Sequence, residues 1–352
     1  MRIMQLIDSL NPGGAERMAV NYANALVGYG HKSFLITTRE EGAFKSLLNP
    51  EVDYYYLEKE TIFDWQALRK LDFYIKRNNI EIIHAHGTSW FFAVLYKLKN
   101  ADIKLIWHDH YGNSDFLENR RILLLKLLSI RFNGIISVNN NLKCWAKKNL
   151  WCDNIIFLNN FIEITNKTLT NLKLEGAANW NLICIANLRP QKDHPNLIEA
   201  FELLSKHHSV ALHLFGKEYG DEYSNKLIEI FDKTPFVFWY GEKENISPWL
   251  FKSDIGVLSS VSEGLPVALL EYADAGLAVV CTDVGECREV LGTEGILVPS
   301  KSPVELAQAI SFYLKNDNKR ENDSIGLKRR IQNFYAAESI MPFYLKFCKD
   351  LC

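Results

Sequence analysis

Short β-like runs alternate with helical patterns along most of this chain. RIMQLI (2–7) is followed by a helical stretch at 15–30, and the order recurs until periodicity fades in the polar segment 161–179. The rhythm then restarts with NLICIAN (181–187). Such alternation predicts βαβ units and parallel sheets with helices on both faces. We therefore predict an α/β chain of two Rossmann-like, doubly wound parallel-sheet domains that face a cleft.

The fading of the pattern sets the expected domain limits. The first domain covers residues 1–162, the second covers 163–335, and a C-terminal helix at 336–352 packs back on the first. The length of 352 residues suits two domains of roughly 100–200 residues each. Ligands of open α/β sheets bind beyond the carboxyl ends of the strands. Candidate site residues are therefore expected in the turns that follow strands.

Composition excludes several classes of function. The net charge is −2, so no overall field favours nucleic acid. No run of about 18 apolar residues occurs and the first residues lack the features of a secretory signal, so we expect a cytoplasmic protein. Seven cysteines without a CxxC pair suit reduced thiols, and no Cys/His group has the spacing of a structural metal site. We therefore expect no bound metal.

The turn NPGGAE (11–16) suits a phosphate. A helix N-terminus presents unpaired N–H groups and a partial positive charge, which attract phosphates. Gly13 and Gly14 would let a ligand approach the backbone just before a helix. The same glycines could instead make an ordinary tight turn, because neither a GxGxxG nor a Walker motif is present.

A second turn, in ANLRPQKDHPNLIEAF (186–201), carries two cations. Arg189 and Lys192 stand after a predicted strand and before a predicted helix. Two cations in such a place suit a diphosphate. The alternative is a basic turn that is merely solvated.

Two glutamates stand eight residues apart in SEGLPVALLE. Glu263 falls on a strand-to-helix turn, and Glu271 falls inside the helix that we expect to start at Pro266. Gly264 and Leu265 would aim backbone N–H groups at a ligand. A carboxylate beside a helix start is favourable for structure alone, but one inside a largely buried helix needs bonding partners. Because a carboxylate can accept two hydroxyls, the pair could hold two sugar rings.

These motifs together resemble the family 4 glycosyltransferases, retaining nucleotide-sugar enzymes of the two-domain GT-B class. EGLPVALLEYADAGLAVVCTDVGECREV (263–290) is similar to the family's E-x7-E signature, and NPGGAERMAVNYANAL is similar to its GGAE motif. ANLRPQKDHPNLIEAF resembles the family's phosphate-binding turn. GIISVNN (134–140) and FLNNFIEI (157–164) resemble the end of its first domain. The motifs occur in family order over nearly the whole chain.

The resemblance implies a role for each part. The first domain would bind the acceptor and the second domain would bind the nucleotide-sugar. In the second domain, Glu271 would bind the ribose hydroxyls and Glu263 would contact the transferred sugar. Lys192 and Arg189 would neutralise the leaving diphosphate. Asn187 stands where the family often has arginine, which makes Lys192 the more secure of the two cations. The implied donor site also includes Gly13, Gly14, Asn187, Gly216, Gly264, Leu265 and Pro266.

Histidines end two predicted strands of the first domain. LIWHDHYGN (105–113) contains His108, Asp109 and His110, and an earlier strand ends at His86. A single histidine at a strand end is commonly structural. The family has a histidine near the reaction centre, and counting along the strand favours His110 for that role. His108, Asp109 and His86 are further candidates for the cleft.

The segment ENRRILLLKLLSIRF (118–132) mixes basic and apolar residues. It has two interpretations, a core helix whose cations reach the surface or a helix on the inner face of a membrane. The four cations do not share one narrow face of a helical wheel, which favours the core helix. A lipid-linked glycan acceptor is compatible with the second interpretation.

We accordingly expect a retaining hexosyltransferase without metal or other cofactor, because no isolated DxD motif is present. It would move a sugar from a nucleotide-diphosphate donor, expected to be UDP-linked, to a glycan or lipid-linked glycan during surface polysaccharide synthesis. The alternatives are a sugar-nucleotide epimerase or hydrolase of the same fold and a non-catalytic glycosyltransferase-like subunit. The missing GxGxxG motif disfavours a nicotinamide oxidoreductase.

Overall fold

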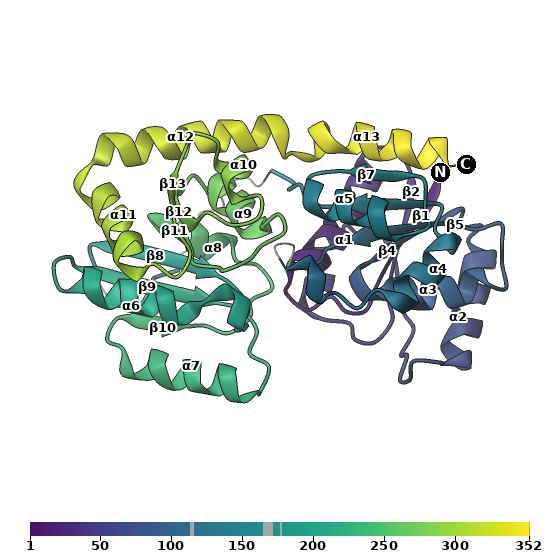
Figure 1. Ribbon diagram of the computed structural model, residues 1–352, viewed down its shortest axis with the longest axis horizontal. Helices are drawn as coiled ribbons and strands as arrows, with labels where there is room; N and C mark the ends of the chain where they lie inside the picture. Colours follow the sequence, from purple (N-terminus) through teal and green to yellow (C-terminus); the bar gives the residue numbers. More distant parts are fainter. Residues whose placement is uncertain (113–115, 165–171, 177, 352) are drawn as a thin grey trace. The chain divides into compact units, whose positions relative to one another are not determined.

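The computed structural model describes residues 1–352 except 113–115, 165–171, 177 and 352 (Figure 1). The chain forms two compact units, which are described separately below. Unit 1 contains Met1–Glu163 together with Ala337–Cys352, and unit 2 contains Ile164–Ala336. Among the described residues, every helix is too short or too polar to span a bilayer.

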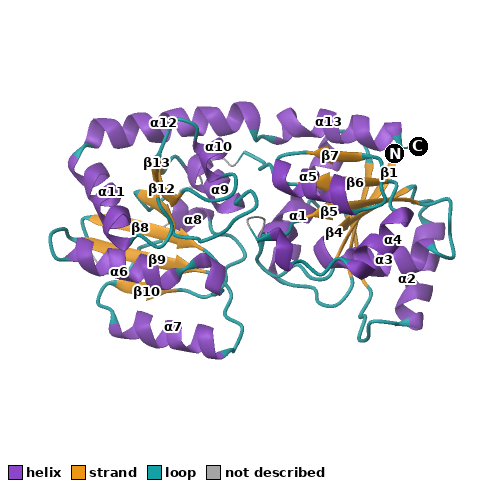
Figure 2. Cartoon of the chain, in the orientation of Figure 1, coloured by secondary structure: helices purple, strands orange, loops and turns teal. Residues whose placement is uncertain are grey.

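Unit 1 contains a seven-stranded parallel sheet in the order β3-β2-β1-β4-β5-β6-β7 (Figure 2). The strands are β1 Arg2–Ile7, β2 Lys32–Thr37, β3 Asp53–Tyr56, β4 Ile82–His86, β5 Lys104–Asp109, β6 Gly134–Ser137 and β7 Ile155–Phe157. The helices are α1 Gly14–Gly28, α2 Trp65–Arg77, α3 Trp90–Lys97, α4 Leu123–Leu128, α5 Asn140–Asn149 and α13 Ala337–Asp350. Strand order reverses between β1 and β4, and such a switch point is where open α/β sheets bind ligands.

The two faces of this sheet differ in character because successive strand residues point to opposite sides. One face, with Leu105 and Trp107 of β5, packs into an apolar core with residues of α2, α3 and α5. The other face carries polar side chains of β1, β4 and β5 under aromatic residues of α1 and α13. The second face therefore holds buried polar groups that must bond to one another.

Unit 2 contains a six-stranded parallel sheet in the order β10-β9-β8-β11-β12-β13, with its switch point between β8 and β11. The strands are β8 Trp180–Ile185, β9 Val210–Phe215, β10 Val237–Trp239, β11 Ile255–Leu258, β12 Ala278–Thr282 and β13 Ile296–Val298. The helices are α6 His194–Ser205, α7 Glu222–Lys233, α8 Ser247–Leu250, α9 Val267–Ala275, α10 Cys287–Leu291, α11 Pro303–Lys315 and α12 Asp317–Phe334. The predicted fold class, two Rossmann-like parallel-sheet domains, is confirmed.

Several helices start where side chains satisfy their first N–H groups. Asp64 accepts from the Ala67 amide at the start of α2, and Asp221 accepts from the Ser224 amide at the start of α7. Gly276 ends α9 with a φ of 79°, a left-handed conformation that favours glycine. These signals are local, so the sequence can carry them.

Other elements differ from the expectation. Pro266 lies just before α9, which begins at Val267, so it is not the first helical residue. The expected helix at 118–132 is broken into α4, the short 3-10 turn Leu117–Asn119 (η3) and the 3-10 turn Ser129–Arg131 (η4). The interpretation of this segment as a core helix is wrong, because Leu123, Leu124 and Leu127 are exposed. Only Leu125 and Ser129 are buried within α4 and η4.

Candidate functional site

The turns after β8 and β11 meet at the switch point of unit 2. The Val261 N–H donates to the Gln191 carbonyl over 2.8 Å, and the Ser259 hydroxyl donates to the Lys192 carbonyl over 2.9 Å. The two turns are thereby fixed against each other, although their residues are about 70 positions apart. This contact brings the basic turn beside the first glutamate of SEGLPVALLE.

Lys192 and Glu263 form an ion pair. The Lys192 Nζ lies 2.5 Å from the Glu263 Oε1, and the Ser260 hydroxyl donates to the same oxygen over 2.6 Å. Glu263 is only 5% exposed, and a buried carboxylate needs such partners. Because an ammonium has three N–H donors, Lys192 could hold Glu263 and still donate to a phosphate oxygen.

A glycine of the next strand-to-helix turn supports the peptide that follows Glu263. Gly285 has a φ of 51°, and a Cβ placed on it would lie 2.1 Å from the Glu263 carbonyl oxygen. The neighbouring Glu286 N–H donates to the Gly264 carbonyl over 3.0 Å. Glycine at 285 is therefore required for the turn that carries Glu263 and Gly264.

The Arg189 side chain has a different partner from that of Lys192, although the Lys192 N–H donates to the Arg189 carbonyl over 2.9 Å. It is exposed, and its Nη2 donates to the Tyr219 hydroxyl over 2.5 Å while its guanidinium lies 4.7 Å from the Tyr219 ring. Asn187 accepts from the Lys217 amide over 2.8 Å, so it ties the β8 turn to the turn after β9. A Cβ on Gly216 would lie 2.1 Å from the Ala186 carbonyl oxygen. Backbone packing against Ala186 therefore explains the glycine at position 216 without a bound ligand.

Glu271 occupies the middle of α9 and is half-buried. The next residue, Tyr272, is buried, and its hydroxyl oxygen accepts from the Ile185 amide of β8 over 2.7 Å. This bond fixes α9 against the end of β8. Leu265 is buried in the turn before the helix. The switch point of unit 2 thus brings together Lys192, Glu263 and the helix that carries Glu271.

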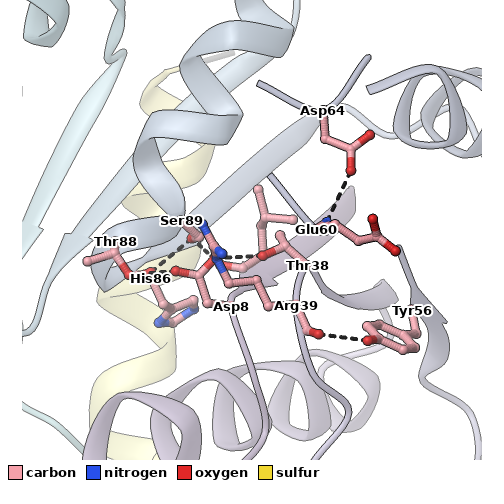
Figure 3. A network of polar contacts seen from close by, with 10 residues as sticks. Asp8, Thr38, Arg39, Tyr56, Glu60, Asp64, His86, Thr88 and Ser89 are labelled. Atoms are coloured by element: carbon pink, nitrogen blue, oxygen red, sulfur yellow. Dashed lines mark hydrogen bonds and ion pairs between the residues drawn. The ribbon is translucent and has the colours of Figure 1, made fainter. Parts of the chain in front are cut away.

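Unit 1 has its own switch point, after β1 and β4. Gly13 precedes α1 with an extended φ of −173°, a conformation open to any residue, and α1 begins at Gly14. Asp8 stands at the end of β1, where its carboxylate accepts from the hydroxyls of Thr38 and Thr88, each over 2.6 Å (Figure 3). Asp8 binds together the ends of three strands. The sequence analysis did not single it out, although it directly follows a strand.

Four histidines form a cluster on the polar face of the unit 1 sheet. The His84 Nε2 lies 3.1 Å from the His108 Nδ1, and the His86 Nδ1 lies 3.0 Å from the His110 Nε2. The first three side chains are fully buried, whereas His110 is half-buried at the end of the row. Asp109 points to the opposite face and pairs with Arg120 over 2.6 Å. His110 is thus the member that a ligand could reach.

Burial keeps these imidazoles neutral. It lowers the pKa of His110 to about 3 and the pKa values of His84, His86 and His108 well below 6.5. Proximity to the other imidazoles lowers the last three pKa values further. A neutral imidazole has one N–H donor and one acceptor nitrogen.

The bonding partners then set the tautomer of His110. The Gln5 Oε1 can only accept, so the His86 Nε2 donates to it over 2.8 Å. The His86 Nδ1 must then accept from the His110 Nε2, which leaves the Nδ1 of His110 with its lone pair. His110 can therefore accept a hydrogen bond from a hydroxyl group. Sequence reasoning missed Gln5, because nothing local links β1 to the β4 histidine.

A metal ion is the other ligand that such a cluster could hold. Ligand atoms of His84, His86 and His108 lie within 4.8 Å of one another. The facing nitrogens of His84 and His108 already share a hydrogen bond, and Tyr344 bonds the other nitrogen of His84 over 3.0 Å. Both nitrogens of His86 are bonded as well. A metal would have to displace these bonds, so the contacts fit a network of neutral imidazoles.

Comparison with solved structures defines the class of fold. The Anabaena protein Alr3699/HepE, solved in complex with UDP and glucose, aligns with a TM-score of 0.82. The alignment covers 99% of this chain and 99% of that chain at 19% sequence identity. Sucrose-phosphate synthase from Thermosynechococcus elongatus aligns over 100% of this chain and 99% of its own, with a TM-score of 0.79 and 13% identity. The fold is the two-domain GT-B fold.

Sequence comparison places the chain among glycosyltransferases. Residues 12–165 match the family described as Glycosyltransferase Family 4, and residues 180–316 match Glycosyl transferases group 1. A Haemophilus influenzae protein called an uncharacterized glycosyltransferase is 26% identical over 86% of this chain and 87% of its own. The Escherichia coli O-antigen biosynthesis glycosyltransferase WbnH is 27% identical over 67% of this chain and 68% of its own. The chain is a glycosyltransferase of the family 4 type.

A shorter match concerns an enzyme whose name includes its acceptor. The N,N'-diacetylbacillosaminyl-diphospho-undecaprenol alpha-1,3-N-acetylgalactosaminyltransferase of Campylobacter jejuni is 33% identical over 88 residues. The match spans 24% of this chain and 23% of that enzyme.

Proposed function

We propose that this glycosyltransferase moves a hexose from a UDP-linked donor to a glycan or lipid-linked glycan acceptor, with retention of configuration and without a metal. The observation that carries the proposal is the meeting of Lys192, Glu263 and α9 at the switch point of unit 2. The solved relative with UDP and glucose supports a UDP-sugar donor. The O-antigen enzyme and the diphospho-undecaprenol enzyme support a role in surface polysaccharide synthesis and a lipid-linked acceptor.

In this proposal unit 2 holds the donor. Glu271 accepts from the ribose hydroxyls, and Glu263 with the amides after it holds the transferred sugar. The bond from the anomeric carbon to the diphosphate breaks through an oxocarbenium-like state, and negative charge grows on the leaving oxygen. Lys192 stabilises that charge, as a positioned cation does in a water-poor site. Arg189 contributes less, since its guanidinium is engaged with Tyr219.

Unit 1 would hold the acceptor. The acceptor hydroxyl attacks the anomeric carbon from the face that the diphosphate leaves, and its proton passes to a leaving phosphate oxygen. The neutral His110 offers its Nδ1 lone pair to a hydroxyl group of the transferred sugar and thereby orients the ring. His86 and Gln5 keep His110 in that tautomer. The acceptor hydroxyl thus attacks the anomeric carbon directly, and the reaction needs no protein nucleophile.

A transfer assay tests the proposal. The protein is incubated with a panel of UDP-sugars and diphospho-undecaprenol-linked glycans, and UDP release is measured with and without acceptor. We expect acceptor-dependent UDP release and a product whose anomeric configuration, read by NMR, equals that of the donor. Inverted configuration would exclude the retaining mechanism. Conversion of the UDP-sugar without an acceptor would instead favour the epimerase or hydrolase alternative.

A further inference from the structure

Charged side chains gather where strands β1, β2 and β3 of unit 1 end. Asp8 directly follows β1, Arg39 lies two residues beyond β2, and Lys59 lies three residues beyond β3. The three strands are parallel neighbours in the sheet, so their carboxyl ends lie at the same edge. Open α/β sheets bind ligands beyond that edge. The three charged residues therefore lie in the part of unit 1 where a ligand is expected.

Lys59 has an unusual environment for a lysine. The residue is only 6% exposed, and its ammonium lies 5.4 Å from the centre of the buried Phe92 ring. Within the described residues, this ammonium forms neither a hydrogen bond nor an ion pair with a carboxylate. An aromatic face attracts a cation, but the three N–H groups of an ammonium also need acceptors. Lys59 therefore carries a buried cation whose N–H donors are available to an anion.

The nearby carboxylates are bonded to other groups. Burial lowers the pKa of Lys59 and the charge of Arg39 lowers it further, whereas the charges of Asp8 and Asp64 oppose this shift. Both Asp8 oxygens accept from threonine hydroxyls, and both Asp64 oxygens accept from backbone N–H groups. These bonds hold the ends of the strands and the start of α2. Asp8 and Asp64 thus reduce the positive charge around Lys59 without occupying its N–H donors.

The backbone of two adjoining turns holds the two cations in place. Glu58 has a φ of 55°, a left-handed conformation that few residues other than glycine adopt. The Lys59 N–H donates to the Thr38 carbonyl over 2.7 Å, and the Tyr56 hydroxyl donates to the Arg39 carbonyl over 2.6 Å (Figure 3). These bonds join the ends of β2 and β3. Strained backbone of this kind is typical of sites where it positions a functional side chain.

We propose that Arg39 and Lys59 form a subsite that binds an oxyanion of the acceptor, a phosphate or a carboxylate group. Arg39 is exposed, and its Nε lies 4.0 Å from the Asp8 Oδ1, which is longer than a hydrogen bond. Its guanidinium can therefore present a fork of N–H donors to two oxygens, and the Lys59 ammonium adds a point charge beside them. The inference rests on the proposed function, in which unit 1 holds the acceptor.

The subsite would make the enzyme select a charged acceptor. The proposed function assigns the donor diphosphate to Lys192 of unit 2, which leaves the cations of unit 1 for the acceptor. A neutral sugar at this edge would cover Lys59 without giving its N–H groups a charged partner. Leaving a buried charged donor unpaired costs binding free energy, so a neutral acceptor would bind more weakly. The acceptor class is therefore a glycan that carries phosphate or carboxylate groups.

Calorimetric titration with inorganic pyrophosphate tests the subsite on the whole protein, first saturated with UDP. Bound UDP fills the proposed donor site, so pyrophosphate then reports on a second oxyanion site. We expect pyrophosphate to bind, and Arg39→Gln and Lys59→Met each to weaken its affinity about tenfold or more, because each removes charge-assisted hydrogen bonds. Methionine keeps the apolar stem beside Phe92, and thermal melts verify that each variant is folded. D-Glucuronate, titrated in the same way, distinguishes the two sources: tighter binding of glucuronate indicates a carboxylate, and tighter binding of pyrophosphate indicates a phosphate.

The matched control is Lys32→Met, which removes an exposed ammonium at the first residue of β2, the strand whose other end leads to Arg39. It should bind pyrophosphate like the unchanged protein. The inference is overturned if the UDP-loaded protein binds neither probe, or if Arg39→Gln and Lys59→Met bind the probes like the control. It is also overturned if both variants lose UDP affinity to the same extent, because the pair would then belong to the donor site. A protein that fails to bind UDP would defeat the proposed donor site, and the variants would still show whether Arg39 and Lys59 bind pyrophosphate.

Discussion

Replacing Lys192 by alanine should damage both stability and turnover, and the two effects can be separated. The Lys192 side chain is about one-fifth exposed, and the Glu263 side chain is almost fully buried. Lys192→Ala therefore leaves a buried carboxylate without its ion-pair partner, although the Ser260 hydroxyl still donates to it. A loss of activity in this variant alone would not show that Lys192 acts on the leaving group.

The structure allows the cost to be worked out. Removing one partner of a buried ion pair costs about 3–5 kcal/mol. The partial exposure of Lys192 and the hydrogen bond from Ser260 to Glu263 place the cost for this pair at about 3 kcal/mol. A domain of the size of unit 2 shifts its melting temperature by about 2–4 °C per kcal/mol. We therefore expect Lys192→Ala to melt about 6–12 °C lower.

The double variant Lys192→Ala/Glu263→Gln removes the buried charge together with the lysine. Its melting temperature should return most of the way to that of the unchanged protein, as measured by differential scanning calorimetry. Its turnover should stay at least about 100-fold low, the loss typical for one removed transition-state stabiliser. A Lys192→Ala variant that melts normally would refute the ion-pair argument. Because Glu263→Gln is expected to impair transfer by itself, recovery of turnover in the double variant would refute the proposed roles of both Lys192 and Glu263.

Three further predictions concern the histidines and the Glu263 turn. Folding holds the pKa values of His84, His86, His108 and His110 below 6.5, so below that pH the unfolded chain binds more protons than the folded one. The free energy of unfolding should therefore fall as the pH decreases from about 6.5, by up to ~1.4 kcal/mol per pH unit for each histidine. Thermal melts at pH 7.5 and pH 5.0 measure this loss. A melting temperature independent of pH would contradict it. His110→Ala should lower transfer and leave calorimetric UDP affinity unchanged; a matching loss of UDP affinity would make His110 structural. Gly285→Ala should lower the free energy of unfolding, measured by urea denaturation, by more than about 2 kcal/mol. The control Gly220→Ala should cost about 1 kcal/mol, because Gly220 also has a positive φ but no atom lies near the position of its Cβ. Equal urea midpoints for the two variants would argue against the packing of Gly285 on Glu263.

Local patterns were enough to predict the fold class and the elements that carry the candidate residues. The alternation of runs predicted the parallel sheets, and Glu263 and Glu271 lie on a turn and in a helix as expected. The loss of periodicity at 161–179 includes the point where the two units divide. The sequence analysis left residues 39–80 unassigned, and these contain β3 and α2. The edge strand DYYY is too short to show alternation.

Contacts between distant residues could not be predicted in the same way. The Lys192–Glu263 pair, the bonds between the β4 and β5 histidines, and the bond from Gln5 all depend on strand order, which no local pattern fixes. The exposure of the α4 leucines also depends on what packs against the segment. The helical wheel of residues 118–132 assumed one continuous helix, whereas the segment forms the short helix α4 flanked by the 3-10 turns η3 and η4. Apolar composition therefore suggested a core helix where the structure has a surface.

Calorimetric titration with UDP tests the central claim most directly, namely that unit 2 holds a nucleotide-sugar by two carboxylates with different tasks. Free UDP carries a ribose but no transferred sugar. We predict that the unchanged protein binds UDP, and that Glu271→Gln weakens this affinity about 10-fold or more, because charge-assisted hydrogen bonds contribute about 1.5–3 kcal/mol. Glu263→Gln should bind UDP like the unchanged protein and fail only in transfer. No UDP binding, or an equal loss of UDP affinity in both variants, would contradict the account.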